Sequence, residues 1–528
     1  MHEIVSERPA AADFNKIRCI KGYEEIVHNF SPYLSDESNL ADGGAEYLFF
    51  PADENEVSSI FREMTLRGVK VTISGARTGL VGGAVPIGGA ILSLEKFDRV
   101  LGFRYDNCSK EFLIKAQCGV TLTSLNDWVM KKKFPDFGSR STFFYPPDPT
   151  EMSAALGGTV ATNASGAKTY RYGPTRNWVR WVKVILASGE VLEIPRGKYF
   201  ATPGGEFIII DSEKDEMIVK IPKYSMPQTK NAAGIFSAPN MDLIDLFIGS
   251  EGNLGAITEV EVALQEWQNS VSIIQFFPSD GKAVDFVISL RKEKMLRPDF
   301  IEFYSSNALD LLLQKQEEDP TIVPMPTIPN GAKSAVFFDI KFDPKNREYD
   351  YSKLEEIVSK HGSKLEMSWV GYERRDLERF RNLRHVLPEI VNSIIVERKK
   401  KIPELHKLGT DLAVPDEYLK EIWAFYKSTL EAVGLEWVAF GHIGNNHFHI
   451  NIMPRSLEEM NTGLSIYNEF AKKAVSYGGT VSAEHGIGKI KKEFLSIMFS
   501  EKQLEQMKAV KLALDPGLMI NPGNLLDM

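Results

Sequence analysis

Three features are scarce in this chain: cysteine, long apolar runs and excess positive charge. Its 528 residues include three cysteines, and Cys19, Cys108 and Cys118 share no motif, so we expect a reducing compartment and no cysteine metal site. No run of about 18 apolar residues occurs, and the acidic start lacks the apolar core of a secretory signal. The formal net charge of -9 argues against nucleic acid as the main partner. We expect a cytoplasmic protein with no transmembrane segment, and peripheral attachment to a membrane stays open.

The length of the chain indicates several domains, because 528 residues exceed one ordinary domain. We expect an N-terminal polar arm with short helical pieces over 1–44, a first domain over 45–268, a second domain over 269–480 and a terminal segment over 481–528. The stretch 195–240 is rich in Gly, Pro and Lys, and we interpret it as an excursion from the first domain.

Hydrophobic periodicity predicts helices and strands in both domains. The predicted strands are 69–73, 90–94, 112–116, 271–277, 299–304 and 334–341, and the predicted helices are 56–67, 283–292, 308–316, 351–361 and 500–514. In the second domain, helices alternate with isolated strands, which is typical of helices layered on one antiparallel sheet. The predicted fold class is α+β.

Three glycine-rich segments lie in the first domain, at 74–83, 145–166 and 249–258. Clustered glycines let consecutive backbone N–H groups curl around a phosphate, and small residues let the backbone approach a flat ligand. The first segment is not a Rossmann fingerprint, because its spacing differs and 81–86 does not begin a helix. One such segment alone is compatible with a plain tight turn. The three together predict a large cofactor such as a dinucleotide.

Four of the nine histidines lie in two short stretches near the C-terminus, one of them beside a glutamate. On a strand, His447, His449 and Asn451 share one face, and His442 precedes a turn that can fold it back toward them. Imidazole and carboxylate suit zinc or a similar divalent ion. His442, His449 and Glu484 are therefore candidates for three ligands that leave positions open for a substrate. A set of ordinary hydrogen-bonded histidines is the alternative.

In combination, these segments resemble the flavin-binding domain of the vanillyl-alcohol oxidase superfamily and, with the histidine motifs, its D-lactate and D-2-hydroxyglutarate dehydrogenase branch. The resemblance covers about residues 45 to 528. It implies a PCMH-type FAD-binding domain of two subdomains, a ferredoxin-like cap and a C-terminal segment that returns to the flavin. The FAD residues that it implies are Gly75, Ala76, Arg77, Thr78, Gly79, Leu80, Gly82, Gly83, Pro147, Asp148, Gly158, Ala161, Thr162, Ser165, Gly166, Ile257 and Asn521. Arg77 stands where covalent flavoproteins often carry His, so non-covalent FAD is implied; this bulky side chain could also pair with a phosphate.

The resemblance selects His442, His449 and Glu484 as the metal site. It implies that His485 is the catalytic base and that Asn451 contacts the substrate. A histidine suits proton transfer because its unperturbed pKa lies near neutrality. Arg384 matches the family's substrate-carboxylate arginine, whose guanidinium binds a carboxylate bidentately. A solvated helical arginine is the alternative there.

The chain departs from the family at two places. The family commonly has Gly-Asp-Gly-Asn between the ligand histidines, whereas this chain has Gly444-Asn445-Asn446-His447. His447 is then an extra metal ligand, a second base or a substrate-binding group, and all three alternatives stay open. Dicarboxylate-specific relatives carry Thr and Lys where this chain has Pro388 and Gly409, with Lys407 nearby but shifted. This departure argues against a long diacid substrate.

The sequence thus predicts FAD-dependent oxidation of a D-2-hydroxy acid, D-lactate or a similar short acid, to the 2-oxo acid. Zinc is the first expectation for the metal, with manganese or iron as alternatives. Electrons would pass to an external quinone, cytochrome, electron-transfer flavoprotein or iron–sulfur partner, and a homodimer stays open. The alternatives are a D-2-hydroxyglutarate-type dehydrogenase, a flavin transferase resembling alkylglycerone-phosphate synthase, a phenol oxidase and a flavoprotein without turnover. The sequence Ala483-Glu484-His485 speaks against the transferase, which carries a run of histidines there.

Overall fold

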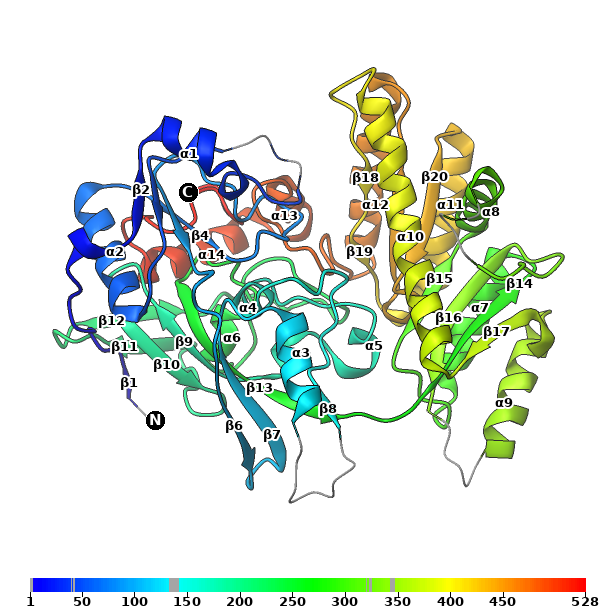
Figure 1. Cartoon of the computed structure of the whole chain (residues 1–528), viewed down its shortest axis with the longest axis horizontal. Helices are drawn as coiled ribbons and strands as arrows, with labels where there is room; N and C mark the ends of the chain where they lie inside the picture. The colour runs from blue at the N-terminus through cyan, green and yellow to red at the C-terminus, as the bar shows by residue number, and fades with distance from the viewer. Residues whose placement is uncertain are drawn as a thin grey trace.

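The computed structural model of the chain describes residues 3–38, 40, 43–132, 142–319, 321, 325–341 and 347–528. Figure 1 shows two lobes side by side, one of which contains both chain ends. The other lobe is formed by the middle and later part of the chain, drawn from green to orange. The mixed helix and sheet content confirms the predicted α+β class.

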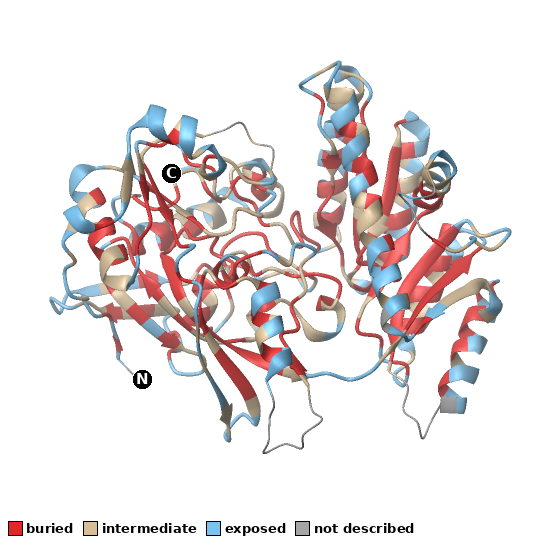
Figure 2. Ribbon diagram, in the orientation of Figure 1, coloured by how far each residue is buried: buried red, intermediate tan, exposed pale blue. Residues whose placement is uncertain are grey.

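The lobe with the chain ends is built on three sheets. Two of these sheets account for most of its buried strands (Figure 2). The mixed sheet has the order β2 (Cys19–Lys21), β3 (Tyr47–Phe49), β5 (Ala90–Ser93), β4 (Val71–Ser74). The antiparallel sheet has the order β10 (Val191–Pro195), β9 (Val179–Ile185), β13 (Ala256–Glu266), β7 (Glu111–Gln117), β6 (Val100–Asp106), with β8 (Phe143–Phe144) on β13. The third sheet joins β1 (Ile4–Val5), β11 (Glu206–Ile210) and β12 (Glu216–Lys220).

The helices of this lobe include the one predicted over 56–67. Those from the first half of the chain are α1 (Tyr23–Asn29), α2 (Glu54–Arg67), α3 (Leu122–Lys131), α4 (Leu156–Ala161), α5 (Thr169–Tyr172) and α6 (Ile244–Phe247). In α2, the Asp53 side chain accepts a hydrogen bond from the N–H of Glu56, and Gly68 ends the helix at φ 66°. The apolar positions at helical spacing are buried, as predicted: Val57, Ile60, Phe61 and Met64.

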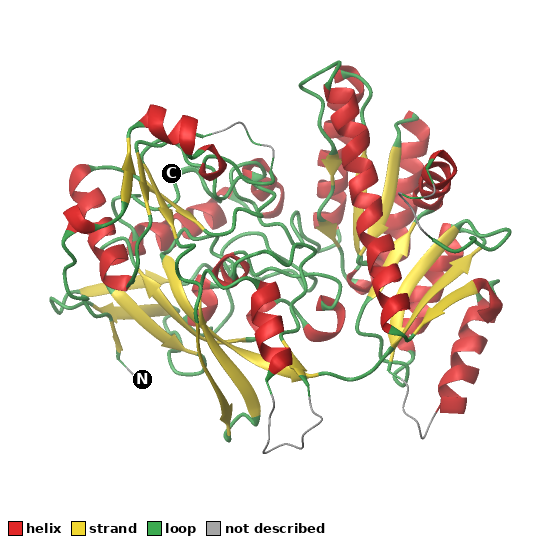
Figure 3. Cartoon of the chain, viewed as in Figure 1, coloured by secondary structure: helices red, strands yellow, loops and turns green. Residues whose placement is uncertain are grey.

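The second lobe contains one antiparallel sheet with helices packed against it (Figure 3). The strand order is β17 (Ser368–Gly371), β14 (Val271–Phe277), β16 (Ser334–Ile340), β15 (Ile301–Tyr304), β20 (Trp437–Gly441), β21 (His447–Ile452), β18 (Leu408–Gly409), with β19 (Leu412–Ala413) also on β21. Its helices are α7 (Asp280–Lys292), α8 (Ser306–Glu318), α9 (Arg347–Lys360), α10 (Arg374–Lys399), α11 (Leu419–Val433) and α12 (Leu457–Ser476). The predicted strands 271–277, 299–304 and 334–341 correspond to β14, β15 and β16.

The C-terminal segment returns to the first lobe. Helices α13 (Lys492–Met498) and α14 (Glu501–Leu514) lie in the lobe that contains both chain ends (Figure 1). Asn521 is fastened to β4, because its backbone N–H donates to Val71 O at 2.8 Å and its Oδ1 accepts from Ile73 N–H at 2.7 Å. The end of the chain therefore lies beside the first glycine-rich segment, which follows β4.

The first 44 residues contribute strands as well as the expected short helical pieces. β1 pairs in parallel with β11, and β2 pairs with β3. Ile17, Ile26 and Leu34 are buried. The pairing partners lie far along the chain, so local composition did not reveal these strands. Within the described residues, no helix has both the length and the apolar character needed to cross a bilayer.

Candidate active site

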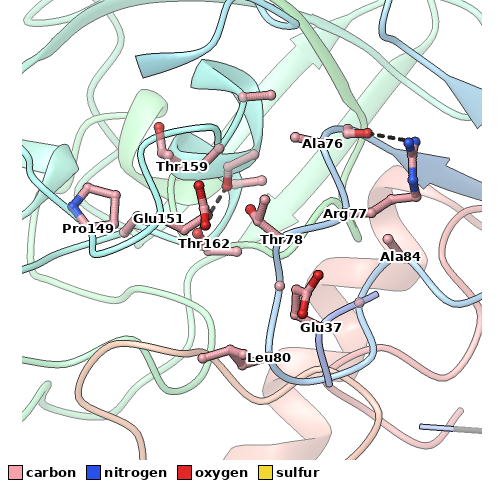
Figure 4. Close-up of a pocket in the computed structure, with 18 of the residues that line it drawn as sticks. Glu37, Ala76, Arg77, Thr78, Leu80, Ala84, Pro149, Glu151, Thr159 and Thr162 are labelled. Carbon is pink, nitrogen blue, oxygen red and sulfur yellow. Dashed lines mark hydrogen bonds between the residues drawn. The ribbon is translucent and has the colours of Figure 1, made fainter. Parts of the chain in front are cut away.

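The three glycine-rich segments converge on one cavity of about 640 Å³. This volume falls within the roughly 300–1,000 Å³ of small-molecule and cofactor sites. Thirteen of the residues expected at FAD line the cavity: Gly75, Ala76, Arg77, Thr78, Gly79, Leu80, Gly83, Gly158, Ala161, Thr162, Ser165, Ile257 and Asn521. Figure 4 shows the first loop facing the segment that carries Pro149, Glu151, Thr159 and Thr162.

The first glycine loop has the backbone features of an anion-binding turn. Among the described residues, the N–H groups of 76–80 donate no hydrogen bond within the chain, so they are free to bind a phosphate. Arg77 adopts φ 60°, and its guanidinium lies 4.3 Å from the centre of the Tyr33 ring. Its Nη1 donates to Gly75 O at 3.2 Å, the bond drawn as a dashed line at Arg77 in Figure 4. Arg77 therefore braces the loop, and its pairing with a phosphate stays a prediction.

Four of the expected FAD residues, Gly82, Pro147, Asp148 and Gly166, are not among the described residues that line the cavity. Asp148 Oδ1 accepts from Lys168 N–H at 2.9 Å. Burial raises the pKa of Asp148, and the charges of Lys168 and Arg384 oppose that shift. A Cβ on Gly166 would lie 2.0 Å from Asp148 O, so only glycine fits this close approach. The two positions pack against each other next to Pro149 and Ser165, which line the cavity.

The three clustered histidines lie on a hairpin formed by β20 and β21. Phe440 pairs with His449 across the two strands, and His442 and His447 stand at the two ends of the connecting turn. Asn446 adopts φ 54° in that turn, a conformation that asparagine tolerates better than most residues. Its side chain accepts from Arg291 Nη1 at 2.7 Å and donates to Val414 O at 3.0 Å. Asn446 thus replaces the family's glycine and also anchors the turn.

Glu484 lies at the centre of this group. Its Oε2 is 3.1 Å from His442 Nε2, 3.6 Å from His447 Nδ1 and 3.9 Å from His449 Nε2. One ligand atom from each of these four residues lies within 4.8 Å of the others. The structure therefore brings together the three predicted ligands and adds His447 to the set.

The outward-facing ring nitrogen of each histidine has its own oxygen neighbour. His442 Nδ1 contacts Glu302 Oε1 at 2.6 Å, and His449 Nδ1 contacts Thr410 O at 3.4 Å. His447 Nε2 lies 3.2 Å from Asp411 Oδ1. Metal-ligating histidines usually direct their second nitrogen to a carboxylate or carbonyl in this way. The donor set and its orientation fit a divalent ion that prefers imidazole and carboxylate.

Burial and neighbouring charges shift the pKa values of the four clustered residues in different directions. Burial alone would raise the pKa of Glu484, but Lys230 and His442 hold it well below its usual range. Burial lowers the pKa of His447 to about 4 and, with help from the neighbouring histidines, lowers the pKa of His449 well below its ordinary value. Burial also depresses the pKa of His442, but Glu302 outweighs it and the net pKa is raised.

Three further charged residues complete the site, and the sequence interpretation missed them. Lys230 Nζ donates to Glu484 Oε2 at 2.9 Å, although Lys230 belongs to the stretch regarded as an excursion. Glu302 comes from β15, which pairs with β20. Asp411 is fully buried between β18 and β19. No local motif marks these residues, because each one faces the site only through pairing between distant segments.

His485, the predicted base, lies at the cavity beside Asp411. Its Nδ1 is 3.5 Å from Asp411 Oδ2, and its backbone N–H donates to the same oxygen at 3.1 Å. Burial lowers the pKa of His485, and Asp411 opposes that shift. His485, His449 and Glu484 line the same cavity as the glycine loops. The metal-type cluster and the loops therefore share one space.

Arg384 lies on α10 beside His385, which lines the cavity, but Arg384 is not itself among the described residues that line it. Its Nη2 is buried without a hydrogen-bond partner among the described residues. Burial lowers its pKa, but Glu302 and Asp148 outweigh this and the net pKa is raised, so the guanidinium stays charged. A buried guanidinium with a free donor suits a ligand carboxylate. Asn451 shares the face of β21 with the histidines but is not among the described residues that line the cavity, and its Nδ2 donates to His449 O at 3.1 Å.

The wall on the side of α10 contains Pro388, one of the two positions where the chain departs from diacid-specific relatives; the other, Gly409, lies on β18 and is not among the described residues that line the cavity. His385, Pro388, Glu389 and Asn392 line the cavity. Lys407 Nζ donates to Asn392 Oδ1 at 2.9 Å, and burial lowers the pKa of Lys407. A positive group therefore lies directly behind the cavity wall, although it is shifted along the chain from the expected position.

Two family models match the chain. The FAD binding domain matches residues 45–195, and the C-terminal domain of FAD linked oxidases matches residues 266–525. The chain therefore belongs to the FAD-linked oxidases and is an FAD-dependent oxidoreductase. This confirms the resemblance inferred from the motifs, at the level of the family and of an FAD-binding domain.

Some of the similar curated proteins are named D-lactate dehydrogenase and others D-2-hydroxyglutarate dehydrogenase. A D-lactate dehydrogenase of Anaerostipes hadrus is 28% identical over 494 residues, which is 91% of this chain and 89% of that protein. A D-2-hydroxyglutarate dehydrogenase of Stutzerimonas stutzeri (strain A1501) is 27% identical over 488 residues, 90% of each chain. A D-lactate dehydrogenase of Archaeoglobus fulgidus is 26% identical and covers 95% of this chain and 98% of its own.

Among solved structures, an alkyldihydroxyacetonephosphate synthase superposes with a TM-score of 0.60 at 14% sequence identity. The match covers 98% of this chain and 88% of that one. This likeness shows a shared fold and nothing about the reaction.

Proposed function

We propose that the protein oxidises a short D-2-hydroxy acid, D-lactate or a close analogue, to the 2-oxo acid. The observation that carries the proposal is the shared cavity: His449, Glu484 and His485 line the same space as the glycine loops. A substrate bound at the metal-type cluster would then lie next to a cofactor held by the loops. The names of the similar proteins support the same substrate class.

The cofactor would be non-covalent FAD, held by the glycine loops. The N–H groups of 76–80, which have no acceptor among the described residues, would bind its diphosphate, and the small residues Gly158 and Ala161 leave room for flat rings. A divalent ion, zinc first and manganese or iron as alternatives, would be held by His442, His449 and Glu484. When bound, the flavin accepts a hydride and the ion polarises the substrate hydroxyl.

The side chains of the protein would orient the substrate and accept its proton. Arg384 would bind the substrate carboxylate, because its Nη2 is buried and unpartnered among the described residues. His485 would accept the hydroxyl proton on its free nitrogen while Nδ1 faces Asp411. The substrate loses one proton and one hydride in total, so the reduced flavin must pass two electrons to an external acceptor. A quinone, a cytochrome, an electron-transfer flavoprotein and an iron–sulfur partner are the candidate acceptors.

A D-2-hydroxyglutarate-type activity is the second candidate, and Lys407 favours it. Its ammonium group contacts Asn392 at the cavity wall, so a second carboxylate would meet a cation there. Pro388 and Gly409 at the expected Thr and Lys positions favour the shorter acid.

Anaerobic reduction of the flavin tests the proposal. Purified FAD-loaded protein would be mixed with D-lactate, D-2-hydroxybutyrate, D-2-hydroxyglutarate, glycolate and the L-isomers, and flavin absorbance followed in a stopped-flow instrument. Rapid bleaching by a short D-isomer is expected, and faster bleaching by D-2-hydroxyglutarate would select the second candidate. If no hydroxy acid bleached the flavin, the proposed reaction would be wrong, and a redox-neutral transferase would become the next hypothesis.

A further inference from the structure

The position of His447 distinguishes this chain from the family pattern, which commonly has Asn there. His447 is fully buried, and neither of its ring nitrogens has a well-aligned hydrogen-bond partner among the described residues. Nε2 still faces Asp411 Oδ1 at 3.2 Å, so Nδ1 is the nitrogen without a partner, and an unsatisfied buried nitrogen is costly inside a protein. A buried nitrogen of this kind needs a ligand that the described side chains do not supply.

The ring of His447 is oriented in the same way as the two ligand histidines. One nitrogen of each ring faces Glu484 Oε2, at 3.1 Å for His442, 3.6 Å for His447 and 3.9 Å for His449. The other nitrogen faces an oxygen outside the cluster, and for His447 that oxygen is Asp411 Oδ1 at 3.2 Å. The ring centres of His447 and His449 lie 4.3 Å apart. The three rings therefore converge on one point beside Glu484.

We propose that His447 is a fourth protein ligand of the metal site, with Asp411 as the carboxylate that orients its ring. The inference rests on the proposed metal site and extends it. Asp411 is suited to this positioning role because Glu484 N–H, His485 N–H and Lys491 Nζ hold both of its oxygens at 3.0, 3.1 and 2.9 Å. A carboxylate fixed in this way cannot turn away from the ring of His447.

A fourth ligand changes what the site does. Three protein ligands leave a tetrahedral ion one open position, whereas four close it, and a substrate then enters only as a fifth ligand. Three imidazoles also favour zinc, iron or nickel over magnesium or calcium. The ion would be held more tightly than in relatives with Asn at this position, and it would exchange more slowly.

The other two roles open to His447 fit the geometry less well. A second base needs access to the substrate, but His447 is fully buried and is not among the described residues that line the cavity. Its two ring nitrogens face Glu484 and Asp411, so neither is directed at a substrate tail. Among the described residues that line the cavity, His449 and His485 are the histidines near Glu484.

The first test measures zinc affinity in the FAD-loaded protein by competition with a chromophoric chelator. His447→Asn installs the residue that the family commonly has, His449→Asn removes a ligand of the proposed site, and His28→Asn is the control at an exposed histidine of α1. Loss of a supporting partner costs about 10–100-fold in metal affinity. We therefore expect a loss of more than about 100-fold for His447→Asn, about 10–100-fold for Asp411→Asn, and no change for His28→Asn.

The FAD-to-protein ratio of each variant is measured in parallel, because a folding defect would lower FAD and zinc together. X-ray absorption of the zinc-loaded wild-type protein needs no variant, and it counts coordinated imidazoles directly. Three imidazoles are expected. A count of two imidazoles would show that His447 is not a ligand and would leave the proposed metal site intact. The same conclusion would follow if His447→Asn kept its zinc affinity while His449→Asn lost zinc. A wild-type protein that binds no stoichiometric zinc, manganese or iron would instead overturn the proposed metal site itself.

Discussion

Glu251 offers the most quantitative test of how the glycine loops and the Glu484-His485 loop are joined. This carboxyl lies in the third glycine segment and lines the cavity. Its Oε1 accepts from Ile487 N–H at 2.7 Å, and its Oε2 accepts from Gly488 N–H at 2.6 Å. Gly486 adopts φ 82°, a left-handed conformation that favours glycine, and a Cβ there would lie 2.9 Å from Oε1. Glu251 thus fastens the segment that carries His485 to the cofactor lobe.

Burial raises the pKa of Glu251 from 4.5 to about 7, although the two N–H groups oppose the shift. A carboxyl with a raised pKa in the fold contributes stability that is fully present below its unfolded pKa and is lost as pH rises through the folded value. The difference between 4.5 and about 7 corresponds to about 3 kcal/mol. This contribution is lost between about pH 4.5 and about pH 8.

The perturbation is Glu251→Gln, which removes the titration. Glutamine leaves one of the two N–H groups without a good acceptor, at a cost of about 1–3 kcal/mol that does not change with pH. The variant should therefore be less stable than wild type in acid. As pH rises, the free energy of unfolding of wild type should fall toward that of the variant and then below it. Glu417→Gln, at an exposed position, is the control for the loss of one surface carboxyl.

Thermal unfolding of the FAD-loaded proteins across this pH range measures how the difference in unfolding midpoint between wild type and variant changes with pH. Difference infrared spectroscopy checks the cause, because the band of a buried protonated carboxyl should fade near pH 7 in wild type and be missing in Glu251→Gln. A difference in unfolding midpoint between wild type and variant that stays constant with pH, together with no such band, would refute the assignment of a protonated Glu251.

Three further predictions concern the reaction. His485→Ala should slow flavin reduction by about 10²–10⁴-fold at unchanged FAD content, and an unchanged rate in stopped-flow measurements would reject His485 as the base. Arg384→Ala should raise KM by about 30-fold or more, from the loss of at least about 2 kcal/mol of charge-assisted binding; Arg384→Lys should recover only part of it, because lysine lacks the bidentate geometry. An unaltered KM in Arg384→Ala would rule out its contact with the carboxylate. Dialysis against a chelator should abolish turnover while FAD stays bound, and zinc or manganese should restore it; full activity in protein shown to be metal-free would contradict the metal site.

Much of the fold was predictable because its signals are local. Helix α2 was predicted over 56–67 from apolar residues at helical spacing, and the structure adds the caps Asp53 and Gly68. β14 runs over the predicted residues 271–277. The glycine loops were also predictable from local sequence, because clustered glycines at short spacing are typical of turns that bind a cofactor. Their convergence on one cavity required only that the family resemblance be correct.

The candidate site was predictable for the residues that belong to motifs. His442, His449, Glu484 and His485 lie together, as their residue types suggested. His447 was left with three alternatives, because a strand pattern gives the face of a side chain but neither its burial nor its neighbours. Arg77 lines the cavity and its pairing with a phosphate stays a prediction, whereas the contact of its guanidinium with Tyr33 of the N-terminal segment had no signal in the glycine loop.

The sequence by itself determined the family, the cofactor loops and the identity of the histidine motifs, because these depend on residue type at short spacing. Only the tertiary structure placed Lys230, Glu302 and Asp411 around Glu484. These residues come from a loop after β12, strand β15 and the connection between β18 and β19, and Lys230 is 254 positions from Glu484 along the chain. Their proximity follows from strand pairing and from the return of the C-terminal segment, which are set by burial over the whole chain. Charged side chains at such places have no local signal, because the cost of burying them is offset by partners that are distant in sequence.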